Sequence, residues 1–475
     1  MTRRERVALY DTPLSDADQR RALGGARTPV AVYGLGKMGL PLAAVYADCT
    51  GAVVGVDVDP DVVERVNRGE CPVEGEPRLP ELVARTVADG SLEATTDHRR
   101  AAERARIHVV IVPTGVRGTE PDLSALFSVT EHVGAELDDG DLVVVECTVP
   151  PGTCRNRVLP TLERASGRSL GEFGLAFCPE RTSSGRAVRD VRGAHPKIVG
   201  GADAESTRAA TLVYDELTDN EVVPVSDLTT AECVKVFEGV YRDVNIALAN
   251  ELATFVDDLD TDVTEAIEAA NTQPYCDIHR PGAGVGGHCI PYYPYFLTAQ
   301  VSGDASLLHT ARRVNDAMPG FVVRKLREGL ARTGTTLDGA SVLLLGLAYR
   351  PGVNETRKSP ARPIARRLSR LGATVHGVDP VVDGDGFDLR PTPLADVPDL
   401  DVDAAVLVTA HEAFDRIDWT AFPPLVVVDG RQALDLADTD HRVYTVGQGW
   451  NVGRPGTVEQ ESNAGRPGPD GADDG

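Results

Sequence analysis

The chain has 475 residues, of which 42% are hydrophobic, and this length is sufficient for two or three domains with apolar cores. Its 72 Asp and Glu residues exceed its 48 Lys and Arg residues and give a net charge of −24. This charge argues against nucleic acid and anionic membranes as partners, because both bind to basic surfaces.

The N-terminal part of the chain shows an α/β pattern. Residues 1–28 form a polar extension without the apolar stretch of a secretory signal. From there to about residue 210, apolar strand-like runs alternate with helical patterns, which predicts a doubly wound parallel sheet of the Rossmann type over 29–210. The expected strands include 29–33, 52–57, 107–112 and 141–145.

The strand signal fades in the middle of the chain, between about 205 and 335. From Thr229 to Asp257 apolar residues recur at helical spacing, interrupted only by Gly239, which predicts one long helix of roughly 29 residues, or ~43 Å. A helix of this length often carries an interface. We therefore expect a central helical domain, 211–320, through which two copies form a homodimer.

The α/β pattern returns after residue 340 and predicts a second Rossmann-like domain over 321–450. The runs 341–346, 374–379 and 404–409 repeat the first three predicted strands, which is a weak internal repeat of one βαβ unit. The tail, 451–475, is acidic and rich in Gly and Pro, and we expect it to be disordered.

Two features of the composition predict the surroundings in which the protein works. Only five of the 48 basic residues are lysines, and an acidic, lysine-poor surface is typical of a halophilic protein because concentrated salt screens its self-repulsion. The eight cysteines contain no CxxC pair, which indicates reduced thiols in the cytoplasm. No His/Cys cluster has metal-ligand spacing and no apolar run reaches about 18 residues, so neither a metal nor a transmembrane helix is expected.

A glycine motif follows the first predicted strand. Gly34, Gly36 and Gly39 have the GxGxxG spacing and open a helix, and Asp57 closes the second strand eighteen residues later. The glycines let the backbone approach a pyrophosphate at the helix N-terminus, while Asp57 accepts from a ribose 2′-hydroxyl and repels a 2′-phosphate. The motif predicts NAD rather than NADP, and the alternative is a tight turn without a ligand.

A second stretch with this spacing, 282–287, lies in a different context. It follows a polar segment and precedes His288, Cys289 and a proline, so we interpret it as a flexible loop that lets a ligand approach the next residues. Cys289 is either an exposed nucleophilic thiol or a small buried hydrophobic residue, and the spacing alone leaves both open. We expect His288 to support the loop and the other seven cysteines to pack in the interior.

Several motifs together identify the chain as similar to a known family. These motifs, in chain order, are Asp57, Val112-Pro113-Thr114, Cys147–Thr153, Cys178–Arg181, Ala231–Lys235 and Gly284–Cys289. Over about 29–450 the chain resembles the nucleotide-sugar 6-dehydrogenases of the UDP-glucose/GDP-mannose dehydrogenase family.

The resemblance implies a four-electron oxidation of a sugar C6 alcohol to a carboxylate, with two NAD+ per sugar. Cys289 matches the family nucleophile, which forms a thiohemiacetal and then a thioester. Lys235 matches the lysine that stabilises oxyanions, Glu180 an acid/base carboxylate and Thr148 a residue that positions water.

The resemblance also assigns the binding residues, with NAD in the N-terminal domain and the nucleotide sugar in the C-terminal domain. Arg350 matches a substrate-binding cation and Arg357 a cofactor contact, and two solvated loop arginines are the alternative. The other expected cofactor contacts are Gly34, Gly36, Met38, Gly39, Asp57, Pro113, Thr114 and Thr148, and the other expected substrate contacts are Glu180, Arg181, Lys235, Asn245, Gly284, Gly286 and Gly287.

Three positions depart from the pattern of enzymes that act on UDP-glucose. Gly239 stands in place of an Asn, Tyr293 in place of an Asp, and Ser184 in place of a second Glu. The oxyanion and water network is therefore expected to be partly rebuilt. Asn245 is about three helical turns from Lys235 and is not expected to replace the missing Asn.

The segments 241–252, 281–290 and 310–316 resemble UDP-N-acetylmannosamine dehydrogenases. We therefore expect a UDP-N-acetylhexosamine substrate, with UDP-N-acetylmannosamine favoured over UDP-N-acetylglucosamine, and room for the acetamide beside Ser184 and Gly239. The alternatives are a UDP-glucose 6-dehydrogenase, a two-electron dehydrogenase of the 6-phosphogluconate or hydroxyacid type, and an inactive nucleotide-binding scaffold.

Overall fold

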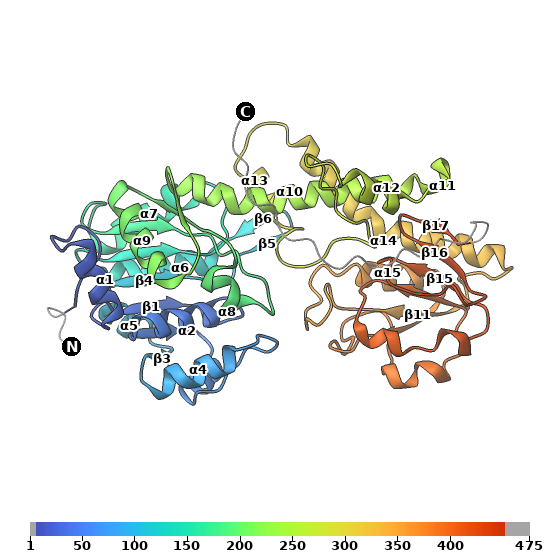
Figure 1. The fold of residues 1–475 in the computed structure, drawn as a ribbon, viewed down its shortest axis with the longest axis horizontal. Coiled ribbons are helices and arrows are strands. Elements are labelled where there is room, and N and C mark those ends of the chain that lie inside the picture. The colour runs from blue at the N-terminus through green and yellow to red at the C-terminus, as the bar shows by residue number, and fades with distance from the viewer. Residues whose placement is uncertain (1–5, 452–475) are drawn as a thin grey trace.

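The computed structural model of the protein describes residues 6–451. Two lobes, each built on a sheet, lie at opposite ends of a long helix that passes along one side of both (Figure 1). The predicted tail, 451–475, lies outside the described residues except for Asn451.

The N-terminal lobe contains an eight-stranded sheet of order β10-β9-β8-β7-β4-β1-β2-β3. From β1 the chain continues to β2 and β3 on one side and then crosses to β4 on the other, so the predicted doubly wound arrangement is confirmed. The strands are β1 (Val30–Tyr33), β2 (Val53–Val56), β3 (Leu92–Thr95), β4 (Ile107–Val110), β7 (Leu142–Val145), β8 (Gly174–Phe177), β9 (Lys197–Gly201) and β10 (Val222–Val225).

Two details of this sheet differ from the sequence expectation. β8 and β9 pair antiparallel, whereas all other neighbouring pairs are parallel. β10 is an edge strand beyond residue 210, and it is only partly buried and contains Pro224, so its hydrophobic signal is weak.

Helices cover both faces of the sheet, so its central strands are buried along their whole length. Val30 and Val32 join the hydrophobic cluster on one face, and Ala31 and Tyr33 join the cluster on the other. The lobe also contains α2 (Gly39–Thr50), α3 (Pro60–Asn67), α4 (Leu79–Ala88), α5 (His98–Arg104), the hairpin β5 (Gly115–Arg117) and β6 (Glu120–Asp122), α6 (Ser124–Glu136), α7 (Leu159–Ser166), α8 (Ala187–Arg189) and α9 (Ala204–Leu217).

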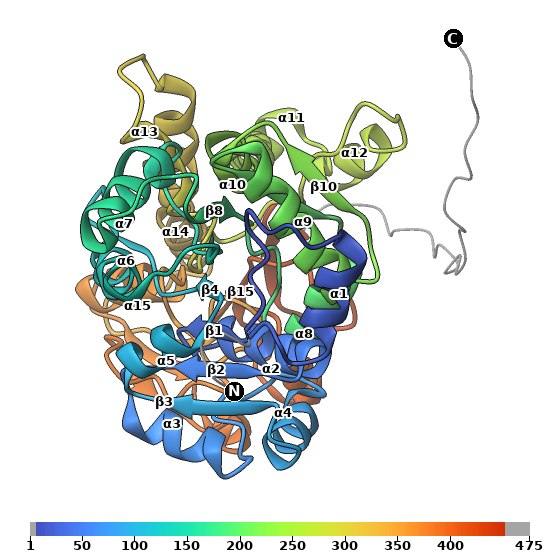
Figure 2. The ribbon, with the colours of Figure 1, turned by 90° about the vertical axis from the view of Figure 1, so that its left-hand side faces the viewer.

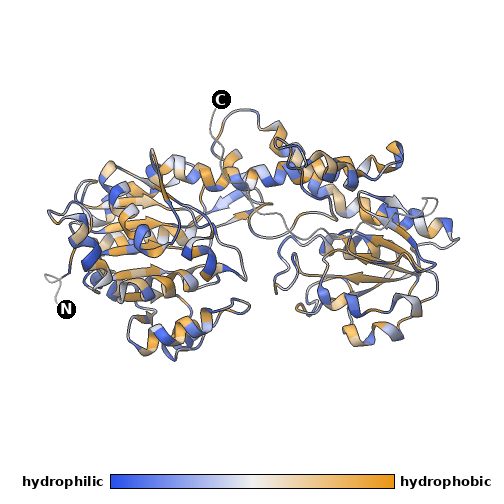
Figure 3. Cartoon of the chain, viewed as in Figure 1, coloured by the Kyte–Doolittle hydropathy of each residue, from blue (hydrophilic) through white to orange (hydrophobic). Residues whose placement is uncertain are grey.

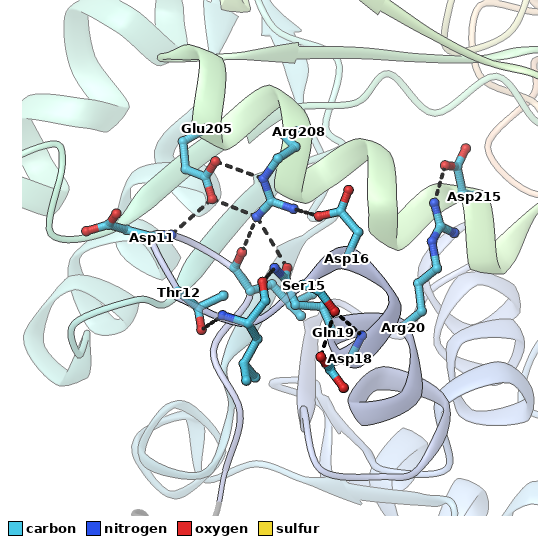
Figure 4. Close-up of polar contacts among 12 residues, drawn as sticks. Asp11, Thr12, Ser15, Asp16, Asp18, Gln19, Arg20, Glu205, Arg208 and Asp215 are labelled. Carbon is cyan, nitrogen blue, oxygen red and sulfur yellow. Dashed lines mark hydrogen bonds and ion pairs between the residues drawn. The ribbon is translucent and has the colours of Figure 1, made fainter.

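The N-terminal extension is part of this lobe. Its helix α1 (Asp16–Gly24) packs against α9 and α2 (Figure 2), and Leu9, Tyr10 and Leu23 are buried. Arg208 on α9 donates hydrogen bonds to the carbonyl oxygen of Leu9 at 2.8 Å and to side chains of the extension (Figure 4). Although the segment is mostly polar, its few apolar residues therefore form a small face that packs into the core of the N-terminal lobe.

The central part of the chain is helical. The predicted long helix is α10 (Leu228–Thr254), 27 residues long, and it begins where the Asp227 carboxylate accepts a hydrogen bond from the Thr230 amide. A second 27-residue helix, α14 (Ser306–Arg332), packs against it. The shorter helices are α11 (Val256–Leu259), α12 (Val263–Ala270) and α13 (Tyr293–Thr298).

The sequence analysis identified one long helix and did not identify this second one, which contains a proline, a residue that usually breaks a helix interior. α14 instead continues through Pro319, where the residue is buried against neighbouring elements, and it passes into the C-terminal lobe. The expected boundary between central and C-terminal domains at 320 thus falls inside a continuous helix.

The C-terminal lobe has a seven-stranded sheet of order β13-β12-β11-β14-β15-β16-β17, and all pairs except β16 with β17 are parallel. Its central strands are mostly hydrophobic, as are those of the first sheet (Figure 3). Its elements are β11 (Ser341–Leu345), α15 (Ala361–Arg370), β12 (Thr374–Val378), β13 (Arg390–Pro391), β14 (Ala404–Leu407), β15 (Val426–Asp429), β16 (Arg442–Thr445) and β17 (Gly449–Trp450).

The internal repeat is visible at equivalent turns of the two lobes. Gly34 after β1 and Gly346 after β11 both have positive φ, 103° and 85°. A Cβ atom on Gly34 would overlap the carbonyl oxygen of Ile111, and one on Gly346 would overlap that of Thr409. In each lobe the turn after the first strand therefore packs against the end of the neighbouring strand on the other side of the switch point. Ligands bind at this point in such sheets.

Candidate active site

The turn after β1 has the geometry of a phosphate-binding turn. A Cβ atom on Gly39 would overlap the carbonyl oxygen of Gly34, so this glycine allows the tight turn itself. A Cβ atom on Gly36 would meet nothing within 4 Å. The backbone at Gly36 thus faces open space at the N-terminus of α2, which suits an anionic pyrophosphate. Met38 contacts Thr182, whose Oγ1 lies 2.9 Å from its sulfur.

Asp57 lies at the carboxyl end of β2, beside this turn. Its Oδ2 accepts a hydrogen bond from the Leu35 amide at 2.8 Å, and its Oδ1 accepts one from Asp59 at 3.0 Å. The carboxylate is half-buried, so part of it remains accessible to a ribose hydroxyl. Its position agrees with the expectation drawn from the spacing.

The equivalent acid of the second repeat, Asp379, is arranged differently. It is buried and accepts hydrogen bonds from four backbone amides, and His411 Nε2 lies 3.2 Å from its Oδ2. Burial alone would raise the pKa of Asp379, but the hydrogen bonds from His411 and the backbone lower it. Because its oxygens are occupied, this acid holds the loop instead of receiving a ribose, and the two lobes cannot bind a nucleotide in the same way.

The predicted nucleophile Cys289 is exposed, while the other seven cysteines are buried or half-buried and all eight are free thiols. It precedes α13, and its carbonyl oxygen accepts a hydrogen bond from the Tyr293 amide at 3.0 Å. The alternative interpretation of Cys289 as a small buried residue is therefore wrong. An exposed thiol in the turn before a helix is accessible for nucleophilic attack.

Lys235 projects from the buried side of α10 toward this thiol. Its Nζ lies 3.7 Å from Oε2 of Glu180. Burial by itself would lower the pKa of Lys235, but the Glu180 carboxylate, followed by Tyr293 and Cys289, outweighs it and raises that pKa well above its ordinary value. The lysine is thus a fixed cation next to the thiol.

Thr148 completes this group. Its Oγ1 lies 3.3 Å from the hydroxyl of Tyr293, and its carbonyl oxygen accepts a hydrogen bond from Thr114 Oγ1 at 2.7 Å. Thr114 and the exposed Pro113 follow β4, and Thr148 follows β7, so adjacent strand ends carry these residues. The structure therefore brings all four predicted catalytic residues to one place.

Glu180 and Arg181 lie on the loop after β8. Glu180 accepts a hydrogen bond from the Thr182 amide. Arg181 donates to the carbonyl oxygen of Pro196 at 2.9 Å and pairs with Glu238 on α10 at 2.6 Å. In the described structure Arg181 thus ties the catalytic loop to the long helix.

Two arginines of the C-terminal lobe reach toward the N-terminal lobe. Arg350 donates to the carbonyl oxygen of Ser184 at 2.6 Å. Arg357 donates to Nδ1 of His288 at 2.8 Å, and the other ring nitrogen, Nε2, lies 3.0 Å from Glu355. Burial and then the charge of Arg357 lower the pKa of His288, so its ring is neutral and Nδ1 accepts.

Lys37 of the glycine turn also acts electrostatically on His288 and lowers the pKa of the ring. One lysine of the N-terminal lobe and one arginine of the C-terminal lobe, Arg357, therefore act on the same ring between the lobes. Sequence reasoning missed this cation pair, since Lys37 was only a variable position of the motif. Two cations there favour the phosphate groups of a dinucleotide.

The loop 282–287 is closely packed rather than loose. Gly284 and Gly287 have φ of 136° and 97°. A Cβ atom on Gly286 would lie 2.8 Å from Tyr349 Cβ, and one on Gly287 would lie 2.9 Å from Tyr349 Cε2. The expectation of a flexible loop is thus wrong, because these glycines let the loop pack against the C-terminal lobe and present His288 and Cys289 between the lobes.

Asn245 anchors the segment before this loop. Its Nδ2 donates to the carbonyl oxygen of Asp277 at 2.6 Å and to the Tyr241 hydroxyl at 3.0 Å, and its Oδ1 accepts from the His279 amide at 2.8 Å. Its assignment to substrate binding stays a prediction, and its observed contacts hold the loop.

A buried polar network that the sequence analysis did not identify fixes the start of the same loop. Asp243 on α10 forms an ion pair with Arg312 on α14 and accepts from Asn315 at 2.8 Å. Asn315 accepts from Asn250 at 2.9 Å, and Asn250 accepts from the Gly282 amide at 2.8 Å. The signal available in the sequence was the spacing of Asp243 and Asn250, which are seven residues apart on a predicted helix and therefore share a face.

One expectation about the substrate pocket is corrected. Gly239 does not leave room for a sugar substituent, because a Cβ atom there would overlap the Tyr293 ring. In residues 6–451 no group of three His, Cys, Asp or Glu side chains is placed to hold a metal ion. Across the same residues, every helix is too short or too polar to cross a bilayer.

Sequence comparison matches three domain profiles to the chain in order. They are the NAD binding domain of the UDP-glucose/GDP-mannose dehydrogenase family at residues 28–218, the central domain at 229–317, and the UDP binding domain at 343–436. The chain belongs to the UDP-glucose/GDP-mannose dehydrogenase family. It is therefore an NAD-dependent nucleotide-sugar dehydrogenase, and the resemblance found from its motifs is confirmed.

Individual members of the family are similar over most of their length. The UDP-N-acetyl-D-mannosamine dehydrogenase of Pyrococcus horikoshii is 34% identical over 410 residues, 85% of this chain and 96% of that protein. A solved structure of a UDP-N-acetyl-D-mannosamine dehydrogenase from Pyrococcus horikoshii, 32% identical, superposes with a TM-score of 0.82 over 88% of this chain and 99% of its own. The NDP-N-acetyl-D-galactosaminuronic acid dehydrogenase of Ralstonia solanacearum is 34% identical over 85% of this chain and 95% of that protein. A UDP-glucose dehydrogenase from Pyrobaculum islandicum, 27% identical, superposes with a TM-score of 0.78 over 89% of this chain and 98% of its own.

Proposed function

We propose that the protein oxidises the C6 alcohol of a UDP-N-acetylhexosamine, with UDP-N-acetylmannosamine favoured, to the carboxylate and uses two NAD+ per sugar. The observation that carries this proposal is the exposed Cys289 thiol beside Lys235 and Glu180, between an NAD-binding and a UDP-binding domain. A two-electron alcohol dehydrogenase needs no thiol at this position.

The proposed reaction balances as R-CH2OH + 2 NAD+ + H2O → R-COO− + 2 NADH + 3 H+. When bound in the N-terminal lobe, NAD+ would supply the hydride acceptor for each of the two oxidations at C6. Between them the Cys289 sulfur adds to the aldehyde carbon to form a thiohemiacetal. Loss of the second hydride gives a thioester, and attack of water on its carbonyl carbon breaks the C–S bond and returns the thiol.

The site residues have distinct roles in this sequence. The ammonium group of Lys235 stabilises negative charge on the C6 oxygen as the tetrahedral species form. Glu180, which holds that ammonium at 3.7 Å, accepts a proton from the attacking water. Thr148 Oγ1 orients this water.

The binding residues divide between the lobes. The turn at Gly36, with Asp57 for the ribose and Arg357 for a phosphate, would hold NAD. Arg350 would contact the sugar nucleotide, and its fork geometry suits a pyrophosphate. The loop of Gly284, Gly286 and Gly287 would present its backbone to the sugar.

The N-acetyl assignment rests on similarity and on chemistry. Relatives named for N-acetyl sugars match 85% of the chain at 34% identity. An acetamide needs a polar partner, and leaving it unpaired in a buried site costs about 1–3 kcal/mol, so a site built for it discriminates by tens-fold.

The test is NADH production from UDP-glucose, UDP-N-acetylglucosamine, UDP-N-acetylmannosamine and GDP-mannose, all in molar KCl. We expect two NADH per sugar and the highest kcat/KM for UDP-N-acetylmannosamine. One NADH per sugar would overturn the four-electron reaction, and a preference for UDP-glucose would overturn the sugar assignment. Turnover of none of them would support the inactive scaffold.

We also propose a homodimer formed through α10. Large apolar side chains, 41–52% exposed, lie at helical spacing along one side of this helix and at the residue that follows it, namely Phe237, Tyr241, Leu248 and Phe255. We expect Phe237→Asp to convert a dimer to a monomer in light scattering. The matched control is Leu307→Asp, which replaces an exposed leucine of α14 and should leave the mass unchanged.

The proposed surroundings are the salt-rich cytoplasm of a halophile. Eight free thiols and the net charge of −24 support this setting. Activity is expected to rise with KCl concentration toward the molar range, and best activity in salt-free buffer would contradict this proposal.

A further inference from the structure

Gly239 and Tyr293 occupy one space in the catalytic site. Gly239 lies on α10, one helical turn after Lys235, and a Cβ atom there would lie 2.8 Å from both Cγ and Cε2 of the Tyr293 ring and would overlap the atom between them. The tyrosine ring therefore fits against α10 only because residue 239 has no side chain. The ring is 6% exposed and packs with Val236 and Phe296.

This packing places the phenol hydroxyl among the reacting groups. The hydroxyl lies 3.3 Å from Oγ1 of Thr148, and the Cys289 thiol is close enough to raise the pKa of the phenol. Tyr293 is also an electrostatic neighbour of Lys235. One hydroxyl thus connects the proposed nucleophile, the residue proposed to orient water and the proposed oxyanion cation.

We propose that Tyr293 is a catalytic residue, whose hydroxyl donates a hydrogen bond to the Cys289 sulfur and, through Thr148, fixes the water that hydrolyses the thioester. This inference rests on the proposed function. It also assigns a role to Gly239: because this residue has no side chain, the Tyr293 ring fits against α10. The two departures noted in the sequence thus form one unit.

The electrostatics of the site agree with a donor role. Burial, ahead of all other effects, raises the pKa of the Tyr293 phenol well above its ordinary value, so the hydroxyl keeps its proton at neutral pH. A neutral O–H donates to an anionic sulfur and adds no negative charge beside Lys235. A carboxylate in this position would only accept and would compete with the thiolate for the lysine.

Tyr293→Phe tests the hydroxyl alone, because the ring that fills the space remains. We expect kcat to fall about 10–100-fold, as for the loss of a hydrogen bond to a charged group, with KM for NAD+ unchanged. The matched control is Tyr295→Phe, the same change two residues along α13, which should keep full activity. Equal kcat in Tyr293→Phe and the parent protein would overturn the proposal.

A second measurement separates this inference from the proposed function. The rate at which iodoacetamide alkylates Cys289, followed by mass spectrometry of its peptide, needs no sugar. In Tyr293→Phe the pH profile of this rate should move to higher pH, because the thiolate has lost a donor. An unchanged profile would overturn the contact with Cys289, even if no UDP-sugar proves to be a substrate.

The pairing with Gly239 gives a further test. Gly239→Ala should displace the ring and reproduce both effects of Tyr293→Phe. The exchange Gly239→Asn with Tyr293→Asp restores the pair that enzymes acting on UDP-glucose carry, and we expect it to recover activity relative to Gly239→Asn alone. If Gly239→Ala retains full activity and alkylation rate, the two residues do not form a unit.

Discussion

Leu23 offers the sharpest test of the N-terminal extension, which lies before the residues matched by the family profile. Leu23 on α1 is fully buried in the same hydrophobic cluster as Val30 of β1 and Leu212 of α9. Leu23→Ala would remove this contact and leave a cavity, at a cost of about 2–5 kcal/mol. With a urea slope of about 3 kcal/mol per M for a lobe of this size, the midpoint of its unfolding should fall by about 0.7–1.7 M.

The assay is urea unfolding followed by circular dichroism, in constant KCl, with the first transition assigned to the N-terminal lobe. Arg20→Ala is the matched control on the same helix. Arg20 pairs with Asp215 and Glu216 at 2.8 and 2.7 Å, but these side chains are 37–38% exposed, so its loss should cost less than about 1 kcal/mol. Equal midpoints for Leu23→Ala and Arg20→Ala would refute the view that the extension belongs to the core.

Three other variants and one pH dependence follow from the site. Cys289→Ala should yield no carboxylate yet bind NAD+ with parental affinity in calorimetry, because the thiol and the glycine turn lie on separate segments; carboxylate formation would exclude the thiol from the reaction. Asp57→Asn should weaken NAD+ binding roughly tenfold or more and reduce the preference over NADP+, measured as a ratio of Kd values. Arg312→Met leaves the Asp243 carboxylate buried without its cation, and should lower the free energy of unfolding by about 3–5 kcal/mol in urea titrations. Because the pKa of His288 is lowered from 6.5 on folding, the unfolded chain takes up this proton first, so stability should be lost as the pH falls below 6.5, less so in His288→Gln.

The sequence alone predicted those features that depend on local spacing. Gly34, Gly36 and Gly39 follow a strand and open a helix, and Asp57 ends the next strand, so chain-local geometry was sufficient to predict a dinucleotide turn and its acid. The apolar runs predicted the two doubly wound sheets for the same reason. Buried parallel strands are hydrophobic throughout, whatever lies beside them.

Features made by segments far apart in the chain required the tertiary structure. A helical period shows that Asp243 and Asn250 share a face of α10 but not that Arg312 and Asn315 meet them there. The continuation of α14 through Pro319 likewise depends on its neighbours, since local propensity predicts a break.

The same division applies to the catalytic site. The family resemblance of separate motifs predicted Cys289, Lys235, Glu180 and Thr148 individually, and the fold brought them together. In the sequence, Gly239 and Tyr293 are two separate departures from the pattern of enzymes that act on UDP-glucose: the first replaces an amide side chain and the second a carboxylate. Only the packing of α13 against α10 turns them into one arrangement, because whether a ring fits depends on the absence of a single Cβ atom on a distant helix.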